Sequence, residues 1–203
     1  MKGAGKAVPV RDGMILQQIR LHTAKCHENV EEKLGGKLLT PGLTPGGYHK
    51  LLTAFYACYQ AMEAAAGQTP MIAELLRERS KLPWLERDIS YLKQSVPKAQ
   101  ANFPTVTVTG TQDSAMALGM MYVMEGATLG GKHIVNYLLD FDWIELDTCL
   151  NFFNSYGNER GKKWKEFTSL LEAYAEDHPP GAERILSGAS EAFGCIENAI
   201  TRV

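Results

Sequence analysis

Apolar residues recur along most of this chain with the three-to-four-residue period of amphipathic helices. The first such stretch places Leu16, Ile19 and Leu34 on one face. Asp12 precedes it as a candidate N-cap, and Gly35-Gly36 follow it as a candidate end. The pattern therefore predicts a first helix between these two signals.

Capping and proline signals predict six more helical segments. Thr44-Pro45 and Thr69-Pro70 each place a capping side chain before a proline at the first helical position. In 104–111 valine alternates with threonine, as in a strand, but a lone strand has no partner, so we expect an extended loop. The expected helices cover 45–66, 70–80, Pro83 to about Ser95, Asp113 or Ser114 to Leu139, 146–175 with a break near Gly157, and 180–201.

This pattern predicts an all-α, single-domain helical bundle. Residues 14–203 would form the bundle and 1–13 an N-terminal tail. The connections between the expected helices are short, as in compact bundles, and 203 residues suffice for one full core.

Composition narrows the classes of function. With 21 basic and 23 acidic residues the net charge is −2, so the chain lacks the basic surface that binding to nucleic acid requires. The longest apolar stretch, Ala115 to Met124, is about half of the roughly 20 residues that span a bilayer. The N-terminus has no apolar signal region, and no hydrophobic tail follows Val203. We expect a cytoplasmic protein with no membrane partner.

The four cysteines give no sign of a metal site or a disulfide framework. Cys26, Cys58, Cys149 and Cys195 are too widely separated for a CxxC pair or a zinc-ligand spacing. We expect buried thiols in a reducing compartment.

The first predicted helix carries a histidine where a hydrophobic residue is expected. His27 shares a face with Arg20, Thr23 and Glu31. A neutral imidazole that binds iron needs an acceptor for its other N–H, and a carboxylate one turn away suits that role. Arg20, two turns earlier, could pair with a carboxylate on a ligand. A core histidine with satisfied hydrogen bonds is the alternative interpretation.

The long predicted helix after Asp113 contains three interior glycines, Gly126, Gly130 and Gly131. Together they cost about 3 kcal/mol relative to alanine, at roughly 1 kcal/mol each. Gly126 and Gly130 clear one stripe on which a flat ligand could lie, although tight packing of two helices explains the spacing equally well. A histidine helix facing a glycine-lined helix could enclose a planar, metal-centred ligand.

Two segments together resemble the bacterial haem oxygenases, particularly the biliverdin-producing type linked to bacteriophytochromes. Arg20, Thr23, His27 and Glu31 match the proximal spacing R-x-x-T-x-x-x-H-x-x-x-E. Residues 122–131, YVMEGATLGG, are similar to the distal signature YVxEGSxLGG. Weaker similarity extends the resemblance over about residues 14–200.

The resemblance implies oxidative cleavage of haem at a meso carbon, with dioxygen and external electrons, to biliverdin, carbon monoxide and free iron. Haem would be both substrate and cofactor, with His27 as the iron ligand. Gly126 and Gly130 would let the distal helix lie against the ring, with Gly131 completing the signature, and Arg20 and Tyr122 would contact the propionates. A ferredoxin or a flavoprotein reductase would supply electrons, and a bilin-accepting phytochrome would be a further partner.

One departure from the family pattern concerns water on the distal side. The usual serine is Ala127 here, so one anchor for distal water is missing. We hypothesise that His133, two turns after Gly126, borders the distal pocket, and a surface or packing role is the alternative.

Other classes of function remain open at this point. A non-catalytic haem-binding or scaffold protein could share the fold. A thiaminase-like hydrolase needs an activated cysteine, but the side chain of Cys26 points about 100° away from that of His27. A di-iron oxidase needs Glu-x-x-His pairs, which the sequence lacks. A helix-bundle interaction module would bind no haem. The position of the cleaved meso carbon, the electron donor, the oligomeric state and the role in iron release or chromophore supply stay undetermined.

Overall fold

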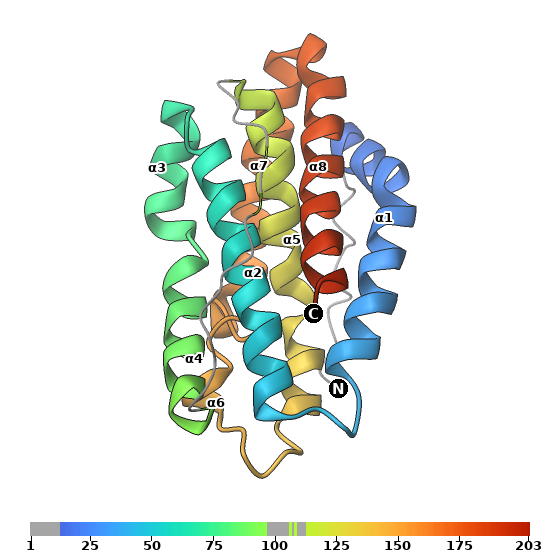
Figure 1. Ribbon diagram of the computed structural model, residues 1–203. Coiled ribbons are helices and arrows are strands. Elements are labelled where there is room, and N and C mark those ends of the chain that lie inside the picture. Colours follow the sequence, from blue (N-terminus) through green and yellow to red (C-terminus); the bar gives the residue numbers. More distant parts are fainter. Residues whose placement is uncertain (1–12, 97–105, 107, 109–112) are drawn as a thin grey trace, which may run out of the picture.

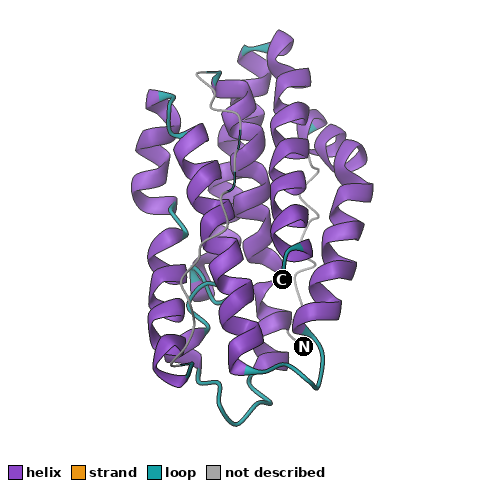
Figure 2. Cartoon of the chain, viewed as in Figure 1, coloured by secondary structure: helices purple, strands orange, loops and turns teal. Residues whose placement is uncertain are grey.

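The computed structural model describes residues 13–96, 106, 108 and 113–203. Within these ranges the secondary structure is helical and contains no strand (Figure 2). The all-α prediction is therefore confirmed. The helices are α1 (Met14–Leu38), α2 (Pro45–Ala66), α3 (Pro70–Arg79), α4 (Leu82–Ser95), α5 (Ser114–Leu138), α6 (Leu146–Cys149), α7 (Arg160–Asp177) and α8 (Ala182–Thr201), with 3-10 turns η1 (Gly157–Glu159) and η2 (Pro179–Gly181).

Helix α5 runs through the middle of the bundle (Figure 1). It packs most extensively on α8 and also contacts α2, α3 and α7. Helix α1 packs against α8 and α7 rather than against α5. The α5–α8 contact is close because a Cβ at Gly119 would collide with the Ile185 carbonyl, and one at Gly188 with the Met116 carbonyl. Close glycine packing between helices thus occurs here, away from Gly126 and Gly130.

Helix α1 extends beyond its predicted end. It continues through Gly35 and Gly36 to Leu38, because Leu38 is fully buried and its packing outweighs the cost of two glycines. At its start the N-cap is Gly13, which forms no side-chain cap. The predicted cap Asp12 lies outside the described residues, as do residues 1–11 of the tail expected over 1–13.

The segment predicted as helical over 146–175 is broken near Gly157, as expected, but the break is wider than predicted and begins at residue 150. Helix α6 ends at Cys149, and turns fill 150–156 before η1 and α7. The carboxylate of Asp88, on α4, accepts hydrogen bonds from the backbone N–H groups of Asn151 (2.9 Å) and Phe152 (2.8 Å). These bonds replace the helical ones, so a residue remote in sequence determines the course of the 150–156 loop.

The other helix boundaries follow the predictions closely. Thr44 accepts a hydrogen bond from Gly47 N (3.1 Å), and Asp113, rather than Ser114, accepts one from Met116 N (3.0 Å). Thr69 precedes α3 without a side-chain cap. Apart from Val106 and Val108, the loop expected over 104–111 lies outside the described residues.

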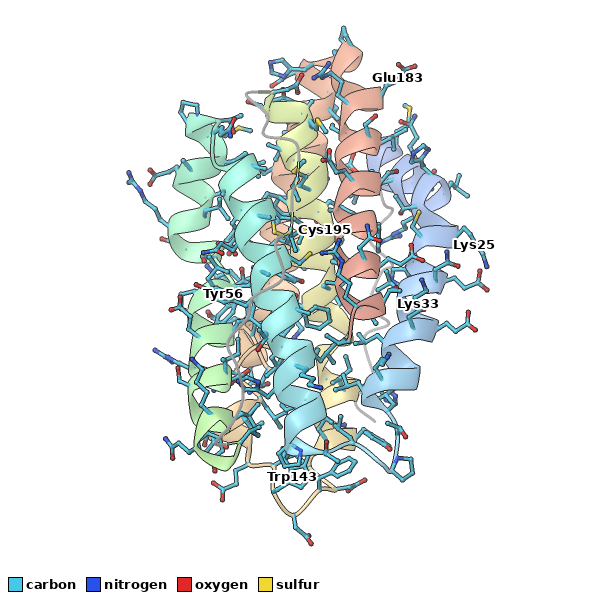
Figure 3. All side chains as sticks on the ribbon, in the orientation of Figure 1. Lys25, Lys33, Tyr56, Trp143, Glu183 and Cys195 are labelled. Carbon is cyan, nitrogen blue, oxygen red and sulfur yellow. The ribbon has the colours of Figure 1, made fainter. Side chains whose placement is uncertain are left out.

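Charged side chains such as Lys25 and Lys33 point outward from α1 (Figure 3). The cysteines are free thiols, with Cys58, Cys149 and Cys195 buried and Cys26 half-buried. Among the described helices, none combines the length and apolar character needed to cross a membrane.

Asp88 should make the stability of the apo protein depend on pH. Burial raises its pKa to about 6, although the N–H donors of Phe152 and Asn151 oppose this shift. Because the folded-state pKa exceeds the ordinary value of 3.8, the stability from protonated Asp88 is complete below that value and is lost as pH rises through 6. This contribution is at most about 3 kcal/mol.

Urea unfolding of the wild type and Asp88→Asn, at several pH values between 5 and 7, measures this contribution. We expect the difference in unfolding free energy between the two proteins to change with pH, since asparagine does not titrate. Parallel pH profiles would show that Asp88 does not titrate in this range.

Candidate functional site

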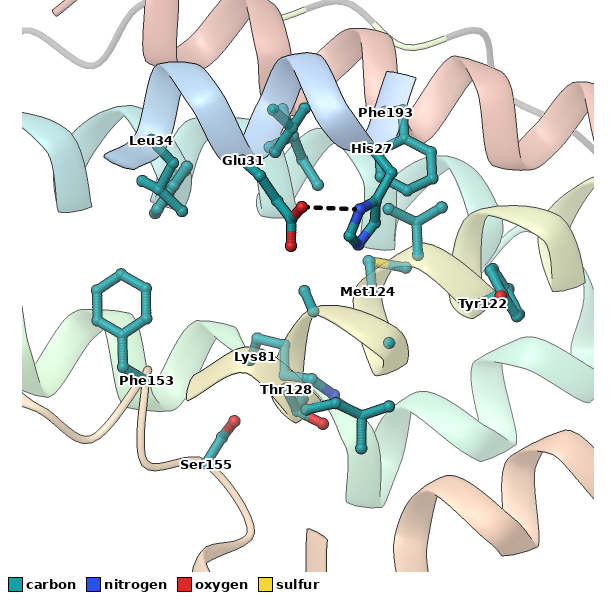
Figure 4. A pocket seen from close by; sticks show the side chains of 18 of the residues that line it. His27, Glu31, Leu34, Lys81, Tyr122, Met124, Thr128, Phe153, Ser155 and Phe193 are labelled. Atoms are coloured by element: carbon teal, nitrogen blue, oxygen red, sulfur yellow. Dashed lines mark ion pairs between the residues drawn. The ribbon is translucent and has the colours of Figure 1, made fainter. Parts of the chain in front are cut away.

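A cavity of about 590 Å³ separates α1 from α5. Figure 4 shows His27 and Glu31 of α1 above it, with α5 and the 150–156 loop below. Apolar side chains provide most of the remaining wall, from α2, α5, α8 and the loop: Phe55, Met124, Phe153, Phe193 and Ile196. The cavity is large enough for a sizeable ligand and is mostly apolar with few polar groups, as binding sites commonly are.

Eight of the ten site residues predicted from the sequence line this cavity. They come from two helices that the sequence separates by about a hundred residues, and the fold brings them to opposite sides of one space. These residues are Arg20, Thr23, His27, Glu31, Tyr122, Gly126, Ala127 and Gly130.

His27 lies on the cavity wall rather than in the core. Its side chain is 58% exposed, so the interpretation as a buried core histidine was wrong. Nδ1 lies 3.4 Å from Oε2 of Glu31, one turn later. The other ring nitrogen, Nε2, faces the cavity (Figure 4), and Phe193 packs edge-on against the ring. A carboxylate beside Nδ1 favours the tautomer whose Nε2 lone pair is available to a metal.

The α5 side of the cavity is open backbone at Gly130. A Cβ built there would meet nothing within 4 Å, and one at Gly126 would contact only Trp164, at 3.6 Å. Helix packing therefore does not require glycine at Gly130. These positions leave room for a flat group against the helix, as the planar-ligand interpretation expects.

Two predicted site residues do not line the cavity. Gly131 packs against the 150–156 loop, because a Cβ there would collide with the carbonyl oxygen of Phe153. His133 is exposed on α5 and is absent from the cavity wall, contrary to the hypothesis that it borders the distal pocket. Position i+7 from Gly126 retains the helix face only approximately, and the neighbouring residue Ile134 lines the cavity instead.

Arg20, Tyr122 and Thr23 occupy the α1 and α5 walls near His27. Tyr122 is 8% exposed and its ring packs against Trp164, with centroids 5.4 Å apart. Thr23 is buried, and its hydroxyl donates to the carbonyl of Ile19 (2.8 Å). That bond keeps the Thr23 hydroxyl within its own helix.

A buried ionic cluster that the sequence analysis missed supports the α5 side. Glu125 accepts from Arg79 Nη1 and from Lys81 Nζ, both at 2.6 Å, and from the Tyr156 hydroxyl at 2.9 Å. Lys81 is 1% exposed and also lines the cavity. Burial lowers its pKa and the carboxylate of Glu125 opposes that shift. Arg79 and Lys81 come from the junction of α3 and α4, whereas Tyr156 comes from the 150–156 loop and Glu125 from α5, so no local spacing could reveal the cluster.

The cavity wall offers a single histidine as a metal ligand, His27. This suits a ligand that carries its own metal together with most of the metal's other ligands. Among the described residues, no cluster of three or more histidine, cysteine or acidic side chains could hold a metal ion. This argues against a di-iron carboxylate centre in the described part of the chain. A single histidine facing open backbone suits a planar macrocycle whose iron needs one protein ligand. The fold and cavity therefore define an all-helical protein whose cavity has room for a planar metal-centred group.

The comparison with protein families agrees with this class. The family described as "Heme oxygenase" matches residues 14–201. The chain therefore belongs to the haem oxygenase family, which indicates an oxidoreductase that degrades haem. A search of curated proteins yields no match.

Solved structures of haem oxygenases share the fold. The enzyme from Leptospira interrogans gives a TM-score of 0.73 at 15% identity, covering 94% of this chain and 100% of that one. Heme oxygenase 2 from Chlamydomonas reinhardtii, solved without heme, gives 0.70 at 15%, covering 92% and 96%. The NO- and CO-bound enzyme from Neisseria meningitidis gives 0.65 at 19%, covering 93% and 90%. At these identities the likeness establishes the fold alone.

Proposed function

We propose that this protein is a haem oxygenase that cleaves haem at a meso carbon to biliverdin, carbon monoxide and iron, with His27 as the iron ligand. The observation that carries the proposal is the position of His27 Nε2, which faces a cavity whose opposite wall is open backbone at Gly130. Bound haem would be the substrate and would also supply the iron that activates dioxygen.

The α1 side of the cavity holds the ligand. His27 would bind the iron through Nε2, and Glu31 would accept a hydrogen bond from Nδ1 and so keep the ring in the required tautomer. Arg20 and Tyr122 would hold the propionates, Arg20 through charge-assisted hydrogen bonds. Together these contacts set the rotation of the ring within the cavity, and hence which meso carbon is presented.

The α5 side of the cavity shapes the space in which the cleavage occurs. Open backbone at Gly126 and Gly130 allows close approach of the ring to the helix. Apolar residues such as Met124 and Phe153 line the cavity and would keep bulk water away from a bound ring. The protein's contribution is therefore mainly placement and exclusion of water.

The physiological setting is also part of the proposal. The signature in 122–131 supports the biliverdin-producing type linked to bacteriophytochromes, with a bilin-accepting phytochrome as a partner. A ferredoxin or a flavoprotein reductase would supply the electrons. The cytoplasm holds both haem and such donors, and we propose it as the location.

Haemin added to the purified protein, followed by ascorbate in air, tests the reaction. We expect a Soret complex that is lost as a biliverdin spectrum appears, with one carbon monoxide released for each haem consumed. A complex that persists under reduction in air would instead identify a non-catalytic haem-binding protein on the same fold. Failure to form any complex would contradict haem binding itself.

A further inference from the structure

We propose that Ser155, in the 150–156 loop, supplies the distal hydroxyl that Ala127 lacks, and that it hydrogen-bonds to a water or small ligand held in the cavity opposite His27. This inference rests on the proposed function, because it assumes that haem occupies the cavity. Ser155 lies outside both sequence signatures, the spacing around His27 and residues 122–131.

Ser155 is a cavity residue with an available hydroxyl. Its residue exposure is only 2%, yet it lines the cavity, and Figure 4 shows its side chain directed into that space from the side opposite α1. Among the described residues no hydrogen bond of its Oγ is found. This hydroxyl is not one of the fully enclosed polar atoms that lack a partner, so it is accessible from the cavity and free to donate to or accept from a ligand or water there.

The other small hydroxyls of the cavity wall are already engaged. Of the three serine and threonine residues that line it, Thr23 donates to the Ile19 carbonyl at 2.8 Å and Thr128 to the Glu125 carbonyl at 2.7 Å. Both bonds stay within their own helices. Ser155 is the one of the three whose hydroxyl is uncommitted.

The segment before Ser155 is held firmly in place. Asp88 binds the backbone N–H groups of Asn151 and Phe152, and the N–H of Ser155 donates to the Phe152 carbonyl at 3.2 Å. The carbonyl of Phe153 packs against α5 where Gly131 lacks a Cβ. These contacts fix Ser155 relative to α5, the helix that carries Ala127.

The residue after Ser155 adopts a strained backbone conformation. Tyr156 has φ of +62°, in the left-handed region, and among the described non-glycine residues it alone has a positive φ. Its hydroxyl bonds Glu125 and Lys81, each at 2.9 Å, and this buried cluster holds the residue there. Strain of this kind persists where surrounding contacts enforce it, and it is typical of functional sites.

Azide affinity of the ferric haemin complex tests the assignment without relying on turnover. Azide binding to the saturated complex would be followed by visible absorbance for the wild type, Ser155→Ala and Ser155→Ala/Ala127→Ser. We expect Ser155→Ala to weaken azide binding about fivefold, because one hydrogen bond to the bound anion is lost. Ala127→Ser, in the same cavity, should restore most of that affinity.

The melting temperature of the apo protein is the matched control. Since Ser155 Oγ bonds none of the residues that the structure describes, Ser155→Ala should leave this melting temperature unchanged. If Ser155→Ala leaves the azide affinity unaffected, the assignment is overturned. It is also overturned if Ser155→Ala lowers the apo melting temperature and Ala127→Ser restores no azide affinity. The proposed function stands in either case. A wild-type protein that binds no haemin would instead contradict the proposed function.

Discussion

Replacing His27 with alanine should lower haem turnover at least about a hundredfold and change the spectrum of the haemin complex, with the fold intact. Removing a partner of a metal ligand typically costs 10–100-fold, and removing the ligand itself costs at least as much. The His27 side chain is 58% exposed and contacts Glu31 and Phe193, so the apo protein loses little packing. Absorption spectra and bilin yield measure the effect.

Controls for this result lie on the same helix. His22 is exposed on α1 outside the cavity wall, so His22→Ala should behave as the wild type. Glu31→Gln should keep the iron bound to His27 but moderately weaken that bond, because the acceptor beside Nδ1 loses its charge. Added imidazole should restore part of the His27→Ala spectrum. A His27→Ala spectrum identical to that of the wild type would show that another residue binds the iron.

Adjacent glycines on α5 should give opposite results when each is changed to alanine. Gly131→Ala should destabilise the apo protein by about 3 kcal/mol or more, because its Cβ would collide with the backbone carbonyl of Phe153, and Asp88 anchors the preceding residue, Phe152. Gly130→Ala should stabilise the apo protein by up to about 1 kcal/mol, because alanine favours the helix and its Cβ meets nothing within 4 Å.

Haemin affinity distinguishes the functional glycine from the structural one. Gly130→Ala should weaken haemin binding although the apo protein is more stable, since the methyl group enters the space proposed for the ring. Urea unfolding of the apo protein and a haemin titration together measure both effects. Unchanged haemin affinity in Gly130→Ala would mean that the ring does not approach α5 at this position.

Local signals predicted the helices well where the ends depend on local bonds. Thr44 and Asp113 cap α2 and α5 as their side-chain chemistry indicates. The ends set by packing were missed. Burial of Leu38 carries α1 past two glycines, and Asp88 stops α6 at Cys149 by bonding the next backbone N–H groups. Such long-range contacts leave no periodic trace in the sequence.

The residues of the candidate site also fall into those that local sequence patterns predict and those that they do not. Helical spacing placed His27 and Glu31 on one face, and the free-energy cost of glycine in a helix interior singled out Gly130. Both predictions need only the residues of one helix, and both residues line the cavity. Ser155 and Lys81 reach the cavity from other segments, so spacing could not find them. His133 was assigned by helical register alone, and a small angular drift over two turns moves it to the surface.

A crystal structure of the haemin complex tests the central claim most directly, since that claim concerns where haem binds. We expect iron bonded to Nε2 of His27, with the ring lying between α1 and the α5 backbone at Gly126 and Gly130. Iron bonded to another side chain, or haem bound outside this cavity, would contradict it.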